Sequence, residues 1–229
     1  MKISILKCGP GIGEIKEKHG HASDWVTKII QNHNEAIEIS VVDSYRCVSP
    51  DFNDNAWILT GSSSSCYEDK DWIVELEILI RRGYELNIPM LGICFGHQII
   101  SQALGGKVVK NSRGWELGSN KIKKTTAGKE SYIFKSIPLD NYYYFSHQDV
   151  VIQLPKNAIE LACNEMGNQA YSVGNNIYGV QFHPEFSYEV MDSYVKRRME
   201  MGIIPKNPFI SKQNTSYLVI NNFINLLEE

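Results

Sequence analysis

Residues Pro89-Met90-Leu91-Gly92-Ile93-Cys94-Phe95-Gly96-His97-Gln98-Ile99-Ile100 decide the fold of this chain. An apolar run enters the segment at Ile88, and a helix-like apolar pattern leaves it towards Ala103. Between the two patterns lies Cys94, with a glycine two residues before it and another two residues after it. Small neighbours are needed where a strand turns sharply into a helix and presents a nucleophile, because the backbone bends there and substrate approaches closely. The segment therefore predicts a buried strand that ends at Cys94, followed directly by a helix.

Cys94 itself has two interpretations. The backbone N–H groups that open the next helix could stabilise both a thiolate and an oxyanion, which favours a nucleophile. Most free cysteines, however, are small buried apolar residues. The turn alone does not distinguish a nucleophile from a buried apolar residue. The distinction depends on whether the chain also supplies a base for Cys94.

The composition is that of an ordinary globular enzyme. With 229 residues, of which 43% are hydrophobic and 21% charged, we expect one domain spanning residues 1–229 with a large core. The formal net charge is -3 and the sequence has no long basic run, so no nucleic-acid or membrane partner is expected.

Cysteine usage and the N-terminus indicate the cellular environment. The five cysteines are an odd number and form no Cys-x-x-Cys pair, which argues against a disulfide framework and against a structural zinc site. The first apolar run is too short for a signal peptide, and no stretch of 18 apolar residues occurs. We expect a reduced, cytoplasmic protein.

Strands and helices alternate through the first 104 residues. Apolar runs predict strands at 3–6, 37–42, 56–60 and 88–94. Ser23 is the expected cap of a helix that continues to Ile30, and Asp69 or Asp71 the expected cap of a second helix. The core positions expected for that second helix are Ile73, Leu76, Ile80 and Leu86. This alternation predicts a three-layer α/β/α fold with a flavodoxin-like, mostly parallel sheet.

The second half of the chain has short alternating or aromatic runs separated by turn residues. We expect it to be antiparallel and to extend the edge of the parallel sheet. The expected strands are Lys107–Val109, Lys121–Lys123, Tyr142–Phe145, Ile159–Ala162, Gln169–Val173 and Ile177–Phe182. Two helices are expected after them, at Glu189–Met199 and Thr215–Leu227.

A glycine-rich segment after the first strand offers a competing site. Gly9-Pro10-Gly11-Ile12-Gly13 superficially resembles a dinucleotide fingerprint, but its spacing is G-x-G-x-G and it contains a proline. The next residues are highly charged and reach Gly20 before a helix could start. We therefore expect a plain loop here.

A cysteine nucleophile needs a base, and the six histidines are the candidates. His19, His21 and His33 lie in a polar region, where surface exposure is the simplest expectation. His97 could approach the site but has no carboxylate near it in sequence. His147 and His183 remain, and both follow aromatic-rich runs.

His183 has the better local argument of the two. Pro184 favours an extended conformation for His183, and in an extended segment residues two apart point to the same side. Glu185 is thereby placed to accept a hydrogen bond from one imidazole nitrogen, which leaves the other to face a thiol. His147 and Asp149 have the same spacing without the proline, so they are the second choice. A turn histidine at a strand end is the structural alternative.

Two separated motifs resemble those of the class I glutamine amidotransferase family. They are Gly92-Ile93-Cys94-Phe95-Gly96-His97-Gln98 and, about ninety residues later, His183-Pro184-Glu185. Thr60-Gly61-Ser62 precedes them, and Ser146-His147-Gln148-Asp149 lies between. Gly114-Trp115-Glu116-Leu117-Gly118 and the Ser146–Asp149 segment resemble those of stand-alone members similar to the amidotransferase domain of GMP synthase. Some plant relatives hydrolyse γ-glutamyl bonds in glutathione conjugates.

The resemblance implies hydrolysis of a γ-glutamyl amide bond, in glutamine or in a γ-glutamyl peptide, through a cysteine thioester. Cys94 would be the nucleophile, His183 the acid and base, and Glu185 the residue that orients the imidazole. Backbone N–H groups of Gly61, Ser62 and Phe95 would form the oxyanion hole. The implied substrate-binding residues are Gln98, Glu116, Ser146, His147, Gln148 and Asp149. No metal or cofactor is implied, because a thiolate is already a good nucleophile.

Two features depart from the family pattern. Ser63 stands where the family commonly has proline, so we expect the oxyanion loop to be completed only with substrate or a partner bound. No synthase domain follows within the 229 residues, so an ammonia acceptor would be a separate subunit. The alternatives are a non-catalytic interaction or thiol-sensing module on the same fold, and a cysteine peptidase of related architecture.

Overall fold

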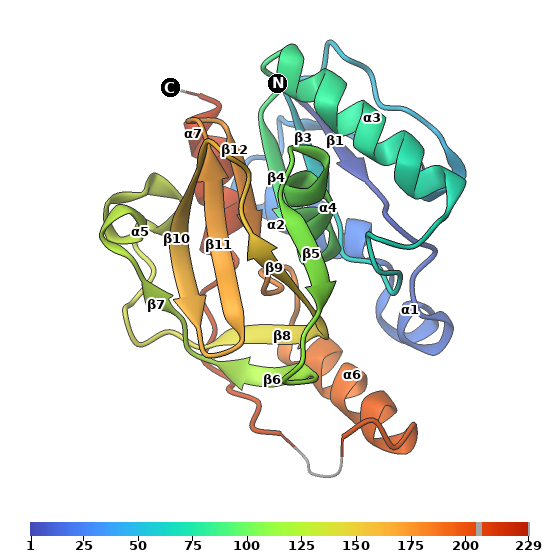
Figure 1. The fold of residues 1–229 in the computed structure, drawn as a ribbon, viewed down its shortest axis with the longest axis vertical. Helices are drawn as coiled ribbons and strands as arrows, with labels where there is room; N and C mark the ends of the chain where they lie inside the picture. The colour runs from blue at the N-terminus through green and yellow to red at the C-terminus, as the bar shows by residue number, and fades with distance from the viewer. Residues whose placement is uncertain (205–207, 229) are drawn as a thin grey trace.

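The computed structural model describes residues 1–204 and 208–228, and its centre is an eight-stranded mixed sheet (Figure 1). Five neighbouring strands are parallel, and three antiparallel strands extend one edge. In sheet order the parallel strands are β2 (Glu38–Val42), β1 (Lys2–Leu6), β3 (Ala56–Leu59), β4 (Met90–Ile93) and β12 (Ile177–Val180). The antiparallel strands are β11 (Gly167–Val173), β10 (Ala158–Asn164) and β7 (Lys123–Lys124).

Helices cover both faces of the parallel part. On one face α2 (Ala22–His33) and α7 (Leu218–Leu226) pack on Ile3, Ile5 and Ile58. On the other face α3 (Asp71–Glu85) and α4 (Phe95–Ala103) pack on Leu6, Trp57 and Leu59. Successive strand residues point to opposite faces, so these fully buried strands need apolar residues at nearly every position. The result is the predicted three-layer α/β/α arrangement.

The remaining elements flank the eight-stranded sheet. They are α1 (Gly13–His19), α5 (Thr126–Glu130), α6 (Tyr188–Glu200), and two short antiparallel ribbons. One ribbon pairs β5 (Lys107–Lys110) with β9 (Asp149–Gln153), and the other pairs β6 (Glu116–Asn120) with β8 (Tyr143–His147). In Figure 1, α6 lies below the sheet, beside β6 and β8. Two single 3₁₀ turns occupy Ser44–Arg46 and Tyr132–Phe134.

The expected mostly parallel α/β sheet with antiparallel edge strands is confirmed, but the second half is not antiparallel throughout. β12 runs parallel to β4, because the tight turn after β11 reverses the chain once more and returns it beside the parallel strands. The expected strand at Lys121–Lys123 shrinks to two residues, Lys123–Lys124. The strands β6 and β9 and the helix α5 were not predicted, since they are short and carry little periodicity.

Four local predictions about helices are wrong. The charged segment after Gly13 forms α1, whose single buried residue is Ile15, and not a plain loop. The cap of α2 is His21 instead of Ser23, because the His21 side chain accepts from the Ser23 N–H. Leu86 follows α3 and is 44% exposed. The last helix begins at Leu218, after turn residues, and its N-terminal neighbour makes no side-chain cap.

Candidate active site

Cys94 lies at the sharp turn from β4 into α4. Its φ of 53° and ψ of -101° put a non-glycine residue in a sparsely populated region, which is the strain expected of a nucleophile turn. Its N–H donates to the Val180 carbonyl oxygen over 2.8 Å, so the parallel pairing of β4 with β12 fixes the turn. A side chain at Gly96 would overlap the Leu59 backbone, which explains a glycine there. Cys94 as a whole is 95% buried.

His183 and Glu185 follow β12 and make the predicted contact. His183 Nδ1 lies 2.8 Å from Glu185 Oε1, and the glutamate side chain is almost completely buried. The His183 N–H donates to the Tyr144 carbonyl oxygen, and the Phe186 ring stacks on the imidazole at 3.9 Å between ring centroids. Backbone and ring contacts therefore hold the imidazole in one orientation.

The electrostatic surroundings favour a protonated His183. Burial alone would lower the pKa of the imidazole, but the negative charges of Glu185 and Cys94 outweigh it and raise the pKa to about 10. Hydrogen bonds with the same two residues add to this shift. The imidazolium is therefore the favoured form of His183 beside Cys94.

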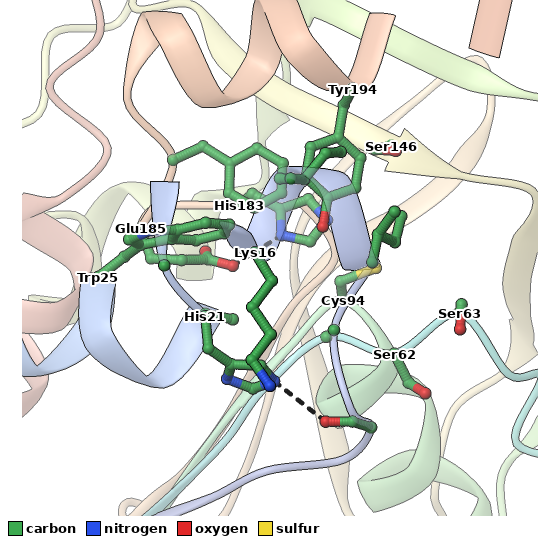
Figure 2. A pocket seen from close by; sticks show the side chains of 18 of the residues that line it. Lys16, His21, Trp25, Ser62, Ser63, Cys94, Ser146, His183, Glu185 and Tyr194 are labelled. Atoms are coloured by element: carbon green, nitrogen blue, oxygen red, sulfur yellow. Dashed lines mark hydrogen bonds and ion pairs between the residues drawn. The ribbon is translucent and has the colours of Figure 1, made fainter. Parts of the chain in front are cut away.

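These residues share one small cavity of about 60 Å³ with the predicted oxyanion loop (Figure 2). Cys94, His183 and Glu185 line it together with Gly61, Ser62 and Ser146. In Figure 2, His183 lies between Glu185 and Cys94. A Cβ atom at Gly61 would lie 3.1 Å from His183 Cε1 and 3.7 Å from Cys94 Cβ, so a side chain there would crowd the imidazole. Phe95 is the first residue of α4, where N–H groups lack helical acceptors.

The opposite wall of the cavity was not predicted. It comes from the start of the chain and from α6, and it is lined by Gly11, Ile12, Ile15, Lys16, Trp25, Tyr194 and Arg198. The segment of α1 is highly charged and lacks an amphipathic pattern, so its sequence carried no clear signal. The glycine-rich segment thus borders the candidate active site.

His21 anchors this wall, so the expectation that it is exposed is wrong. It is 94% buried, and its Nδ1 accepts from the Ser23 N–H. Nε2 must then carry the proton, and it donates to the Gly9 carbonyl oxygen over 3.0 Å. Burial lowers the pKa of His21, which keeps this neutral tautomer. His19 and His33, by contrast, are half-buried and exposed.

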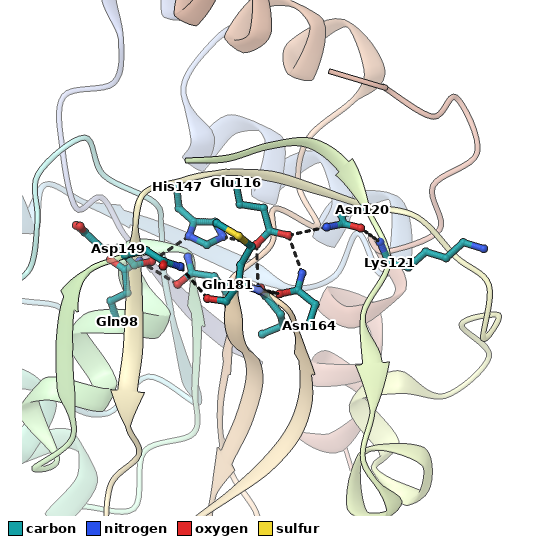
Figure 3. A network of polar contacts seen from close by, with 11 residues as sticks. Gln98, Glu116, Asn120, Lys121, His147, Asp149, Asn164 and Gln181 are labelled. Carbon is teal, nitrogen blue, oxygen red and sulfur yellow. Dashed lines mark hydrogen bonds and ion pairs between the residues drawn. The ribbon is translucent and has the colours of Figure 1, made fainter. Parts of the chain in front are cut away.

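Most of the implied substrate-binding residues lie in a buried polar network instead of the cavity lining (Figure 3). Gln98 Nε2 donates to the Gln181 Oε1 and, over 3.3 Å, to the Asp149 carbonyl oxygen. The Glu116 carboxylate accepts from four side chains, those of Asn120, His147, Asn164 and Gln169. Ser146 alone of the six lines the cavity, and the assignment of all six to substrate binding stays a prediction.

His147 is not placed as a base for Cys94. Its Nδ1 lies 2.9 Å from the Asp149 carbonyl oxygen, and its Nε2 lies 3.0 Å from Glu116 Oε2. The carbonyl oxygen can only accept, so Nδ1 donates to it, while Nε2 faces the Glu116 carboxylate. Both ring nitrogens are thus engaged inside the network.

His97 is also removed from the cavity. It is fully buried, its ring packs on Tyr171 at 4.8 Å between centroids, and burial lowers its pKa to about 3. It is therefore a neutral core residue of α4.

Among residues 1–204 and 208–228, no cluster of three or more histidine, cysteine or acidic side chains could hold a metal ion. In the same part of the chain, no helix has the length and apolar character needed to cross a membrane.

Comparison with known proteins identifies the family. The family model described as "Glutamine amidotransferase class-I" matches residues 26–200. Gamma-glutamyl peptidase 4 from Arabidopsis thaliana is 34% identical over 175 residues, which are 72% of this chain and 70% of the relative. The glutamine-hydrolyzing GMP synthase of Aquifex aeolicus is 42% identical over 127 residues, 54% of this chain but only 24% of that enzyme.

Solved structures show the same fold. A glutamine amidotransferase from Thermotoga maritima superposes with a TM-score of 0.77 at 20% identity, covering 100% of this chain and 98% of the other. One from Methylobacillus flagellatus gives 0.71 at 19% identity, covering 99% and 89%. At these identities the likeness shows the fold alone.

Proposed function

Because this chain belongs to the class I glutamine amidotransferase family, we propose that it hydrolyses γ-glutamyl amide bonds with Cys94, His183 and Glu185 as its catalytic residues. The observation that supports this most directly is the strained Cys94 turn in one cavity with a His183–Glu185 pair joined at 2.8 Å. A nucleophile, a base and an orienting carboxylate are thereby assembled as acyl transfer requires.

In the first half-reaction the Cys94 thiolate attacks the γ-carbonyl carbon and forms a C–S bond. The carbonyl oxygen becomes an oxyanion, which N–H groups of Phe95 and of the Gly61–Ser62 loop stabilise. The imidazolium of His183 gives its proton to the amide nitrogen as the C–N bond breaks. Ammonia or an amine leaves, and a γ-glutamyl thioester remains on Cys94.

In the second half-reaction water replaces the leaving group. Neutral His183 takes a proton from water, hydroxide adds to the thioester carbonyl, and the same N–H groups stabilise the second oxyanion. The C–S bond then breaks, which releases glutamate and restores the thiolate beside an imidazolium. Glu185 stabilises the charged imidazole at the beginning and end of the cycle. The site needs no metal or cofactor for these steps.

Within this reaction, a γ-glutamyl peptide suits the cavity better than free glutamine. Two cationic side chains, Lys16 and Arg198, line the wall opposite the oxyanion loop, while the Glu185 carboxylate is engaged with His183. An amino-acid leaving group carries a carboxylate that could pair with them, whereas ammonia carries none. The relatives named gamma-glutamyl peptidases agree with this preference. Ammonia transfer to a separate synthase subunit is the second candidate, supported by the similarity to GMP synthases.

The test compares three substrates on purified protein: glutamine, a γ-glutamyl dipeptide, and the same dipeptide with its C-terminal carboxylate converted to an amide. We expect the free dipeptide to have the highest kcat/KM, with glutamate and the amino acid released in equal amounts. Preference for glutamine would favour the ammonia-supplying alternative.

Variants separate catalysis from a non-catalytic role of the fold. Cys94→Ala and His183→Ala should each lower kcat by several orders of magnitude, and His147→Ala by less. A rate that survives Cys94→Ala would overturn the mechanism. If wild-type protein releases no glutamate from any of the three substrates, a non-catalytic interaction or thiol-sensing role replaces it.

A further inference from the structure

The loop that follows β3 carries two of the proposed oxyanion donors, the N–H groups of Gly61 and Ser62. Its own sequence does little to restrict its backbone conformation. It contains four consecutive serines, Ser62 to Ser65, and Ser63 is exposed where relatives with proline would have a stiffer backbone. Local bonds exist within the loop, such as Ser64 N–H to Ser62 Oγ at 3.2 Å. Such bonds shape a turn but do not hold it at a set distance from Cys94.

Two residues outside this loop connect it to the rest of the protein: Gln102 of α4, whose Nε2 donates to the Cys66 carbonyl oxygen over 2.8 Å, and Asp149. Ser65 Oγ donates to Asp149 Oδ2 over 2.5 Å, and the Tyr67 hydroxyl donates to Asp149 Oδ1 over 2.9 Å. Each carboxylate oxygen therefore accepts one hydrogen bond from a hydroxyl group of the loop. Asp149 is 95% buried, so both are charge-assisted bonds to a carboxylate that is itself shielded from water.

The other side of Asp149 is attached to the nucleophile helix. The Asp149 carbonyl oxygen accepts from Gln98 Nε2 at 3.3 Å and from His147 Nδ1 at 2.9 Å. Gln98 lies one helical turn after Cys94, and its own N–H donates to the Cys94 carbonyl oxygen over 3.1 Å. One residue thus joins the loop that carries Gly61 to the helix that begins after Cys94.

We infer that Asp149 is a positioning residue that holds the oxyanion loop through Ser65 and Tyr67, and not a contact of the substrate. This inference rests on the proposed function. Asp149 lies outside the lining of the cavity, and both of its carboxylate oxygens already accept hydrogen bonds from Ser65 and Tyr67. Since oxyanion donors act only when held where charge develops, loosening the loop should impair the transition state more than substrate binding.

The kinetic test uses Asp149→Asn and Tyr67→Phe, separately and together, with the preferred γ-glutamyl substrate. In Asp149→Asn one carboxylate oxygen becomes an NH₂ donor, which cannot accept from a hydroxyl. We expect kcat to fall about 10- to 100-fold with KM changed less than about threefold, because displacing a donor costs less than removing it. Tyr67→Phe should have a smaller effect in the wild type, and a smaller one still in the Asp149→Asn background, where only one acceptor oxygen remains.

Tyr84→Phe is the matched control, because Tyr84 is an exposed tyrosine on α3, away from the cavity. It should leave both constants unchanged. A raised KM with unchanged kcat in Asp149→Asn would show that Asp149 contacts substrate and would overturn the inference. Additive effects of the two substitutions would also overturn it, since the tether requires the two residues to act as a pair.

Hydrogen exchange tests the tether without any activity. Peptides covering residues 61–68 should exchange faster in Asp149→Asn and in Ser65→Ala/Tyr67→Phe than in wild type, while peptides of α4 serve as the internal reference. Unchanged exchange in both variants would exclude the tether. If wild-type protein turns over no γ-glutamyl substrate, the proposed function fails, and this measurement still decides whether Asp149 holds the loop.

Discussion

His183 Nδ1 and Glu185 Oε1 lie 2.8 Å apart on residues separated by a single proline. The contact directs the other imidazole nitrogen towards Cys94, and the glutamate charge makes the imidazolium the favoured form. A three-residue segment after one strand therefore sets both the orientation and the charge of the proposed base.

Glu185→Gln should keep the shape of this pair and remove its charge. The amide no longer stabilises the imidazolium, so the pKa of His183 should fall below its present value of about 10. We expect kcat to drop by about 10² to 10⁴, as when the carboxylate of a catalytic triad is neutralised. Imidazole NMR titration gives the pKa, and single-turnover kinetics give the rate; an unchanged pKa would contradict the assigned role of Glu185.

The stability supplied by protonated His183 should depend on pH in a defined direction. The pKa of His183 is raised from 6.5 to about 10 in the fold, so this contribution is complete below the unfolded pKa and is lost as pH rises through about 10. Urea unfolding of wild type between pH 7 and pH 10 should show a loss that His183→Gln lacks. Parallel curves for the two proteins would argue against the thiolate–imidazolium pair.

Burial of neutral His97 should produce the opposite trend on the acid side. Its pKa is lowered to about 3, so the stability associated with the neutral ring is present above the unfolded pKa and is lost as pH falls. Between pH 7 and pH 5 this amounts to about 2 kcal/mol for an unfolded pKa near 6.5. His97→Phe should lose less stability over this interval, whereas His33→Gln, at an exposed histidine, should follow wild type.

Gly96→Ala should disrupt the nucleophile turn. An added Cβ would overlap the Leu59 backbone, and neither α4 nor β3 can move without disturbing the core. Overpacking of this kind costs about 1–3 kcal/mol. Gly13→Ala is the control, since nothing lies within 4 Å of a Cβ there. Urea unfolding compares the two variants, and equal stabilities would contradict the close packing at Gly96.

Removing the acceptor at the centre of the polar network should destabilise the fold more than it harms the chemistry. Glu116→Ala leaves four donors without their carboxylate, so we expect a loss of about 3–5 kcal/mol. Protein that remains folded should keep far more activity than Cys94→Ala. A folded Glu116→Ala variant as inactive as Cys94→Ala would instead indicate a direct contact with the reaction.

Local patterns were enough to predict the parallel half of the fold and the His183–Glu185 contact. Buried parallel strands need continuous apolar runs, and a proline-linked extended segment aligns residues two apart, so both follow from neighbouring residues alone. The direction of β12 could not be predicted in this way, because an apolar run is compatible with parallel and antiparallel pairing.

The sequence by itself determined that Cys94 would end a strand at a glycine-flanked turn, with His183 and Glu185 as partners at another strand end. Only the tertiary structure decided what surrounds them. Burial of His21, the cavity wall from α1, and the bonds from Asp149 to Ser65 and Tyr67 all join residues far apart in the chain. Such contacts depend on how separate elements pack, and no local periodicity encodes them.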